Sequence, residues 1–146
     1  MISVEINNKI KAPLDSVWLK RVINVFSHAA KIKNKKNLSL ALVDAKEMKK
    51  LNYCFRGKNK VTDVLSFAEA DVSEKKMREP DYLGEIIICF SQAKKQAKEY
   101  GHPIKVELAR LLVHGLAHLL GYEHEAVSKK RAEEMEKFEA EILSRL

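Results

Sequence analysis

Hydrophobic and polar positions alternate in several short segments of the chain, a pattern typical of β-strands with one buried face. In the first segment, ISVEINN, the alternation places Ile2, Val4 and Ile6 on one face. Three later segments, LSLALVD, DVLSFAE and LGEIIICF, predict further strands. The last of them is the most apolar short run, which is expected of a central strand. Together they predict a sheet of about four strands.

Elsewhere, apolar residues recur every three or four positions, which predicts amphipathic helices. Pro13 is expected to open a helix that runs towards Lys31, because proline fits the first helical position. A short helix is expected over residues 45–55, and a long one over about residues 127–145. Mixed strands and helices along the chain predict an α+β fold, with a small mixed sheet packed on helices.

Caps and breaks delimit the remaining segments. Ser91 is expected to cap a helix that ends at Gly101, and Pro103 to start the next one. Residues 71–82 are charged and contain a proline, which predicts a mobile loop. The sequence has no internal repeat or linker, and its 146 residues fit one domain over residues 1–146.

Residues 104–120 predict a central helix, because leucine and other apolar residues surround most of the helix axis. Glu107, Arg110, His114 and His118 fall within an arc of roughly 80° on this helix. They form one narrow polar stripe on a helix that is otherwise buried. Residues four positions apart lie about 6 Å apart on one face, so the two imidazoles can meet one ion.

The HxxxH pair is followed by a glycine and a third histidine. Gly121 can adopt the left-handed conformation that ends a helix, and His124 can then return to the same point. Three imidazoles around one open position are a common catalytic zinc arrangement. His114, His118 and His124 are therefore predicted to bind one zinc ion per chain. His28 and His102 lack such a setting and are interpreted as structural or exposed.

The same spacing is similar to the HExxHxxGxxH pattern of metzincin proteases. Gly115, however, stands where those proteases have the glutamate that acts as general base, and glycine offers no carboxylate. Met135, a possible Met-turn residue, lies within an evident helix. A zinc metallopeptidase-like hydrolase stays open as an alternative, with its base supplied from elsewhere. The central helix is also expected to be zincin-like.

The charge of the chain suggests the class of partner, and its cysteine content bears on the cellular compartment. Lysine and arginine outnumber aspartate and glutamate by 27 to 20, which suggests an anionic partner such as nucleic acid. The lysine runs spread along the chain could follow an RNA backbone, but no aromatic-rich RNA-binding signature is present. Two cysteines, Cys54 and Cys89, are too few for a disulfide scaffold. Without a signal-peptide or membrane-spanning pattern, a reducing cytoplasm is expected.

Three blocks of the sequence resemble one family. HGLAHLLGYEH resembles the H-G-x-L-H-L-x-G-Y-D-H signature of the YbeY family of bacterial endoribonucleases and rRNA maturation factors. LNYCFRGKNKVTDVLSFAE and LGEIIIC resemble two further segments of that family, in the same order and spacing. Departures are mild: Ala117 for leucine, Glu123 and Glu85 for aspartate, and Ala68 for proline. None of them removes a predicted metal ligand.

The resemblance implies a zinc-dependent endoribonuclease that prefers single-stranded RNA and matures ribosomal RNA, notably the 3′ end of the small-subunit RNA. It also implies a link to the small ribosomal subunit. No membrane partner and no DNA partner are expected. By motif match, His114, His118 and His124 take the family's zinc-ligand positions, and Arg56 takes the position of its functional arginine. A non-enzymatic ribosome-assembly factor with a structural zinc is a further alternative.

Physical chemistry gives Arg56 a suitable task. It lies in the basic segment FRGKNK, expected to be a turn, and a guanidinium can bind two oxygens of a phosphodiester that gathers negative charge. Thr62, Asp63 and Ser66, in the segment that follows, are interpreted mainly as structural residues that hold the loop and the strand edge.

Overall fold

The structure is a computed structural model that describes residues 1–69, 80–121 and 129–146. Most of the loop predicted over residues 71–82 lies outside the described residues, as do His124 and the lysines of residues 75–78.

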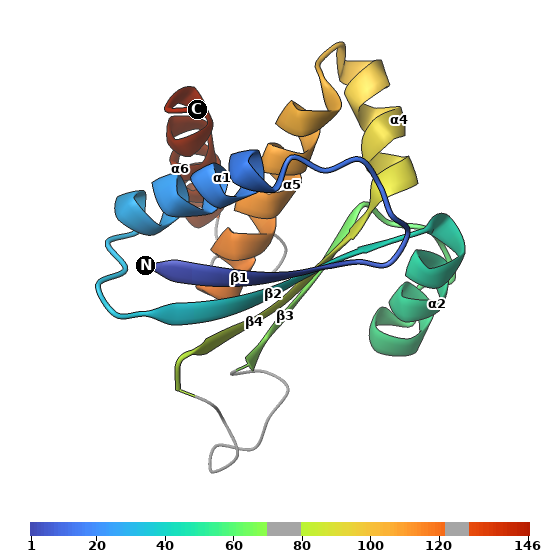
Figure 1. The fold of residues 1–146 in the computed structure, drawn as a ribbon, viewed down its shortest axis with the longest axis horizontal. Coiled ribbons are helices and arrows are strands. Elements are labelled where there is room, and N and C mark those ends of the chain that lie inside the picture. The colour runs from blue at the N-terminus through green and yellow to red at the C-terminus, as the bar shows by residue number, and fades with distance from the viewer. Residues whose placement is uncertain (70–79, 122–128) are drawn as a thin grey trace.

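Within the described residues, four strands form one mixed sheet in the order β1-β2-β4-β3 (Figure 1). Strands β1 (Ile2–Asn8), β2 (Lys36–Val43) and β4 (Tyr82–Cys89) run parallel to one another. Strand β3 (Val64–Ala68) pairs with β4 in the antiparallel direction and forms one edge of the sheet. The predicted mixed sheet of four strands is confirmed, and the apolar strand β4 is an inner strand, as predicted.

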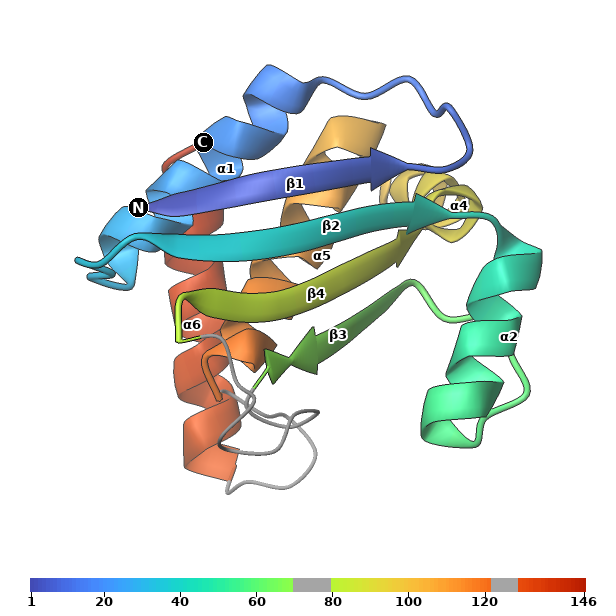
Figure 2. The same cartoon turned by 60° about the horizontal axis from the view of Figure 1, so that its bottom comes forward.

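Helices cover both faces of the sheet unequally (Figures 1 and 2). The main core lies on one face, where the sheet packs against α1 (Ser16–Ala29), α4 (Phe90–Tyr100), α5 (Ile104–Leu119) and α6 (Lys129–Ser144). A smaller cluster on the other face packs under α2 (Ala45–Arg56). Alternation along β4 explains the division, since Ile86 and Ile88 enter the main core while Ile87 and Cys89 enter the smaller cluster.

Two helix starts differ from the predictions. Helix α1 begins at Ser16 rather than at Pro13, because the Asp15 side chain caps it and accepts the Trp18 N–H at 3.0 Å. Helix α4 begins at Phe90, directly after β4, so the predicted cap Ser91 lies inside its first turn.

The other predicted helix limits agree with the structure. Gly101 ends α4 in the left-handed conformation with a φ of 70°, and Pro103 is the cap that precedes α5. Helix α6 ends at Ser144, one residue before the predicted limit. Among the described residues, no helix is both long enough and apolar enough to cross a bilayer.

Candidate metal centre and the position of Arg56

Helix α5 is the central helix of the fold, as predicted. It contacts α1, α4, α6, β3 and β4, and its apolar residues from Leu108 to Ala117 are buried. Gly115 explains how closely α5 approaches the sheet, because a Cβ atom at this position would lie 3.0 Å from Cδ1 of Ile86. The position held by a glutamate in metzincins therefore faces the packed surface of β4.

His114 and His118 lie together on the polar stripe of α5. Their Nε2 atoms are 3.0 Å apart, and the two rings meet edge to face with centroids 4.5 Å apart. The side chain of His114 keeps 28% of its surface exposed, so the pair is accessible from solvent. The helical spacing thus places two imidazole nitrogens at one point, as the sequence predicted.

Glu139 of α6 is a member of the site that sequence reasoning missed. Its Oε1 atom lies 2.9 Å from Nδ1 of His114, and its side chain is 16% exposed. A carboxylate that accepts the Nδ1 proton fixes the tautomer of His114, so that its Nε2 atom carries the lone pair and faces Nε2 of His118. Only the packing of α6 against α5 identifies Glu139, since α6 carries several other glutamates and 25 positions separate it from His114.

The donor set fits a zinc ion. Two nitrogen ligands of a tetrahedral zinc ion lie about 3.3 to 3.4 Å apart, close to the 3.0 Å between the Nε2 atoms. A carboxylate behind a ligating histidine is the usual outer partner of such sites. Within residues 1–69, 80–121 and 129–146, no group of three or more potential ligands is placed to hold a metal ion. The third predicted ligand, His124, lies outside these ranges.

Glu107 and Arg110, the first two residues of the polar stripe, have a structural role. Glu107 is fully buried, and its carboxylate accepts hydrogen bonds from Arg110 Nε and Gln96 Nε2, both at 3.0 Å. His102 Nε2 lies 2.6 Å from its second oxygen. Burial raises the pKa of Glu107, but the hydrogen bonds from Arg110, His102 and Gln96 outweigh burial and lower it below its ordinary value. This cluster joins α4 to α5.

Arg56 is the last residue of α2 and not part of the following turn, because Gly57 ends the helix in the left-handed conformation. Its Nη2 atom donates to the carbonyl oxygen of Ser66 at 3.0 Å, and its guanidinium carbon lies 5.2 Å from the ring centroid of Phe67. The structure therefore holds Arg56 against the edge strand β3. It brings together His114 and His118, while Arg56 occupies a separate position.

Asp63 holds the start of β3. It accepts the N–H of Val64 at 2.8 Å and a bond from Gln96 at 3.2 Å, and the hydroxyl of Thr62 donates to it at 3.4 Å. Ser66 offers its carbonyl oxygen to Arg56. These contacts agree with the structural interpretation of Thr62, Asp63 and Ser66.

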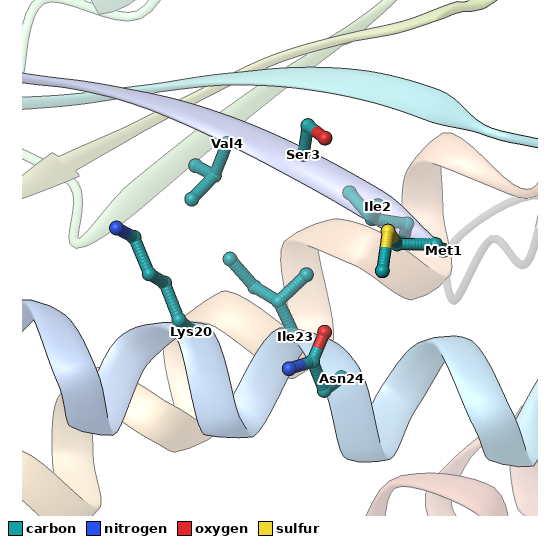
Figure 3. A pocket seen from close by; sticks show the side chains of 7 residues that line it. All are labelled: Met1, Ile2, Ser3, Val4, Lys20, Ile23 and Asn24. Atoms are coloured by element: carbon teal, nitrogen blue, oxygen red, sulfur yellow. The ribbon is translucent and has the colours of Figure 1, made fainter.

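A pocket of about 270 Å³ lies between β1 and α1 (Figure 3). Its lining includes the apolar side chains of Ile2, Val4 and Ile23, together with Lys20 and Asn24. Neither the histidine pair nor Arg56 contributes to this pocket. Its lining contains no aspartate, glutamate, histidine or cysteine, so it offers neither a catalytic acid–base pair nor a metal-binding group.

The fold and the site together define a small α+β protein whose central helix presents a carboxylate-supported histidine pair. The family model described as "Endoribonuclease YbeY" matches residues 2–146. The chain belongs to this family, and it is an RNA-cleaving hydrolase, as the sequence resemblance predicted.

Individual relatives agree with the family match. The chain is 42% identical to "Endoribonuclease YbeY" of Staphylococcus carnosus (strain TM300) over 118 residues, which cover 76% of each protein. It is 36% identical to "Endoribonuclease YbeY" of Roseiflexus sp. (strain RS-1) over 148 residues, 99% of this chain and 92% of that protein. The solution structure of TM1509 from Thermotoga maritima matches with a TM-score of 0.62 and 29% identity, over 99% and 91% of the two chains.

Proposed function

We propose that residues 1–146 form a single zinc-dependent domain that cuts single-stranded RNA during ribosomal RNA maturation, at the 3′ end of the small-subunit RNA. The observation that carries the metal part of this proposal is the pair of Nε2 atoms 3.0 Å apart, supported by Glu139. Family membership is consistent with the RNA part.

We assign the metal to His114, His118 and His124. When bound, zinc supplies Lewis acidity that activates water near neutral pH and polarises a phosphoryl oxygen. The chain's own residues orient the histidine ligands and hold their helix in place. His114 is oriented by Glu139, so its Nε2 lone pair faces His118. Packing of the buried side of α5 against β4 keeps the helix that carries both imidazoles in place.

Arg56 is assigned to the phosphodiester. Its guanidinium is exposed, and the hydrogen bond to Ser66 uses one of its five N–H donors. The remaining donors suit two oxygens of a phosphate group, which bind a guanidinium in a bidentate manner. Charge that develops on the phosphoryl oxygens is stabilised by a cation positioned in advance.

Partners and location follow from the same proposal. A formal net charge of +7 favours an RNA surface, and the small ribosomal subunit offers such a surface beside the substrate. Cys54 and Cys89 are both free thiols, which suits the reducing cytoplasm where ribosomes assemble.

One experiment separates this function from the peptidase alternative. The purified protein is incubated with labelled single-stranded RNA and with casein, each with and without chelator. Chelator-sensitive RNA cleavage with intact casein is expected, because Gly115 offers no base and its position faces Ile86. Chelator-sensitive casein digestion without RNA cleavage would overturn the proposal. RNA binding without chelator-sensitive cleavage would favour an assembly factor with structural zinc.

Arg56→Ala is expected to lose most RNA cleavage while it keeps its metal. One exposed hydrogen bond contributes about 1 kcal/mol, so the melting temperature should fall by no more than about 2–4 °C. Initial cleavage rates, metal content and thermal melts of the variant and of Lys58→Ala, a neighbouring exposed cation, form the comparison. A large fall in melting temperature would show that Arg56 serves folding.

Glu139→Gln is expected to weaken metal affinity by about 10- to 100-fold, the usual effect of losing an outer carboxylate. Chelator competition measures the affinity. Glu141→Gln is the matched control, because Glu141 lies on the same helix but is exposed and pairs with Arg145 instead. Equal affinity of the Glu139 and Glu141 variants would remove Glu139 from the site.

A further inference from the structure

We propose that the end of α2 and the edge strand β3 form a base-stacking site for the single-stranded RNA substrate. The site consists of Phe55, Arg56 and Phe67, and is termed the α2 platform below. This inference rests on the proposed function and adds a substrate contact to it.

The ring of Phe55 is unusually open to solvent. It is 62% exposed, and every residue from 53 to 60 is exposed. Large aromatic rings are usually buried on folding, so a ring this open at the end of a helix calls for a partner. Tyr53 and Tyr100 are the other strongly exposed aromatic residues in the described ranges. Tyr53 is two positions from Phe55 and therefore points to another side of α2, and Tyr100 lies apart on α4.

Phe67 holds the aromatic and the cationic parts of the platform together. The ring of Phe55 lies 5.2 Å from the ring of Phe67, and the guanidinium of Arg56 lies 5.2 Å from the same ring. The hydrogen bond from Arg56 to Ser66 fixes the guanidinium further. Because both groups contact one ring, a base stacked on Phe55 would lie beside a phosphate bound by Arg56.

The charge around the platform complements a polyanion. Residues 45–60 contain six lysines and arginines, at 46, 49, 50, 56, 58 and 60, against the single acid Glu47. Glu47 is itself paired with Lys9 at 3.0 Å. Aromatic faces combined with basic side chains are the usual means of binding single-stranded nucleic acid. A duplex stacks and pairs its bases internally, so it offers no free base to an exposed ring.

The position of β3 allows one RNA strand to contact both the platform and the histidine pair. β3 is an edge strand (Figure 2), and it contacts α5 as well as carrying Phe67. Phe67 belongs to the cluster on the face of α2, whereas α5 packs on the opposite face. RNA that crosses this edge of the sheet would pass from the platform towards His114 and His118.

The test compares two oligonucleotides of equal charge. One is a 2′-O-methyl single strand with all its bases, shown by gel to stay uncut during the measurement, and the other is the same strand made abasic. Fluorescence anisotropy gives the Kd of each for the metal-loaded wild type, Phe55→Leu and Phe55→Trp. Tyr100→Leu is the matched control, because it removes an equally exposed aromatic ring from α4.

Phe55→Leu is expected to weaken binding of the base-containing strand by at least about fivefold, the loss of one stacked base. The Kd of the abasic strand should change less than twofold, and Phe55→Trp and Tyr100→Leu should bind like wild type. With cleavable RNA, Phe55→Leu should raise KM more than it lowers kcat.

If Phe55→Leu lost the same affinity for both strands, or lost affinity for neither, the proposed stacking site would be refuted. A wild type that binds the two strands with one affinity would also refute it. If the wild type bound neither strand, the proposed function would fall as well.

Discussion

Replacement of His114 by alanine is expected to abolish stable metal binding and to reduce RNA cleavage by more than about 100-fold. The loss should exceed the effect of removing an outer carboxylate, since a ligand itself is removed. The fold should survive, because alanine favours a helix and the His114 side chain is already partly exposed. Elemental analysis of wild type and variant, with RNA cleavage rates, measures both effects.

His28→Ala is the control for this variant, since His28 is an exposed histidine on α1. It should keep one metal ion per chain and the wild-type rate. Equal metal content in His114→Ala and wild type would contradict the assignment. Undiminished cleavage by a metal-free His114→Ala would mean that the activity came from a contaminant.

Of the substitutions proposed for this chain, Glu107→Ala is expected to lower the free energy of unfolding the most, by about 2–4 kcal/mol. The change leaves Arg110, His102 and Gln96 without their shared acceptor in the interior between α4 and α5. Arg110 keeps 37% of its side chain exposed and can recover some hydration, which limits the loss. Urea unfolding monitored by circular dichroism measures it, and a loss below about 1 kcal/mol would contradict the prediction.

The same carboxylate predicts how stability depends on pH. Because the folded state lowers the pKa of Glu107 below its ordinary value of 4.5, its contribution is complete above about pH 4.5. The contribution is lost as the pH falls through the lower folded pKa. Glu107→Gln should therefore be less stable than wild type at pH 7, with a difference that narrows in acid. A constant difference from pH 7 to pH 3 would refute this linkage.

The local patterns of the sequence predicted the elements well. Period-two alternation identified β1, a continuous apolar run identified β4, and the nearly complete apolar surface of residues 104–120 identified the central helix. The juxtaposition of His114 and His118 was also predictable, because 3.6 residues per turn places positions i and i+4 on one face wherever the helix lies. Helix starts were less predictable, since Asp15 and Pro13 both offer a plausible start and only one caps the helix.

Contacts between distant segments were decided by the tertiary structure alone. Glu139 meets His114 because α6 packs against α5, and Phe55 meets Phe67 because α2 lies against the edge of the sheet. The sequence signature marked Arg56, but its contact with Ser66 of β3 depends on the packing of α2 against the sheet. Residue spacing fixes geometry within one helix or strand through its period. Which elements become neighbours depends on burying apolar surface across the whole chain, and no local period encodes that result.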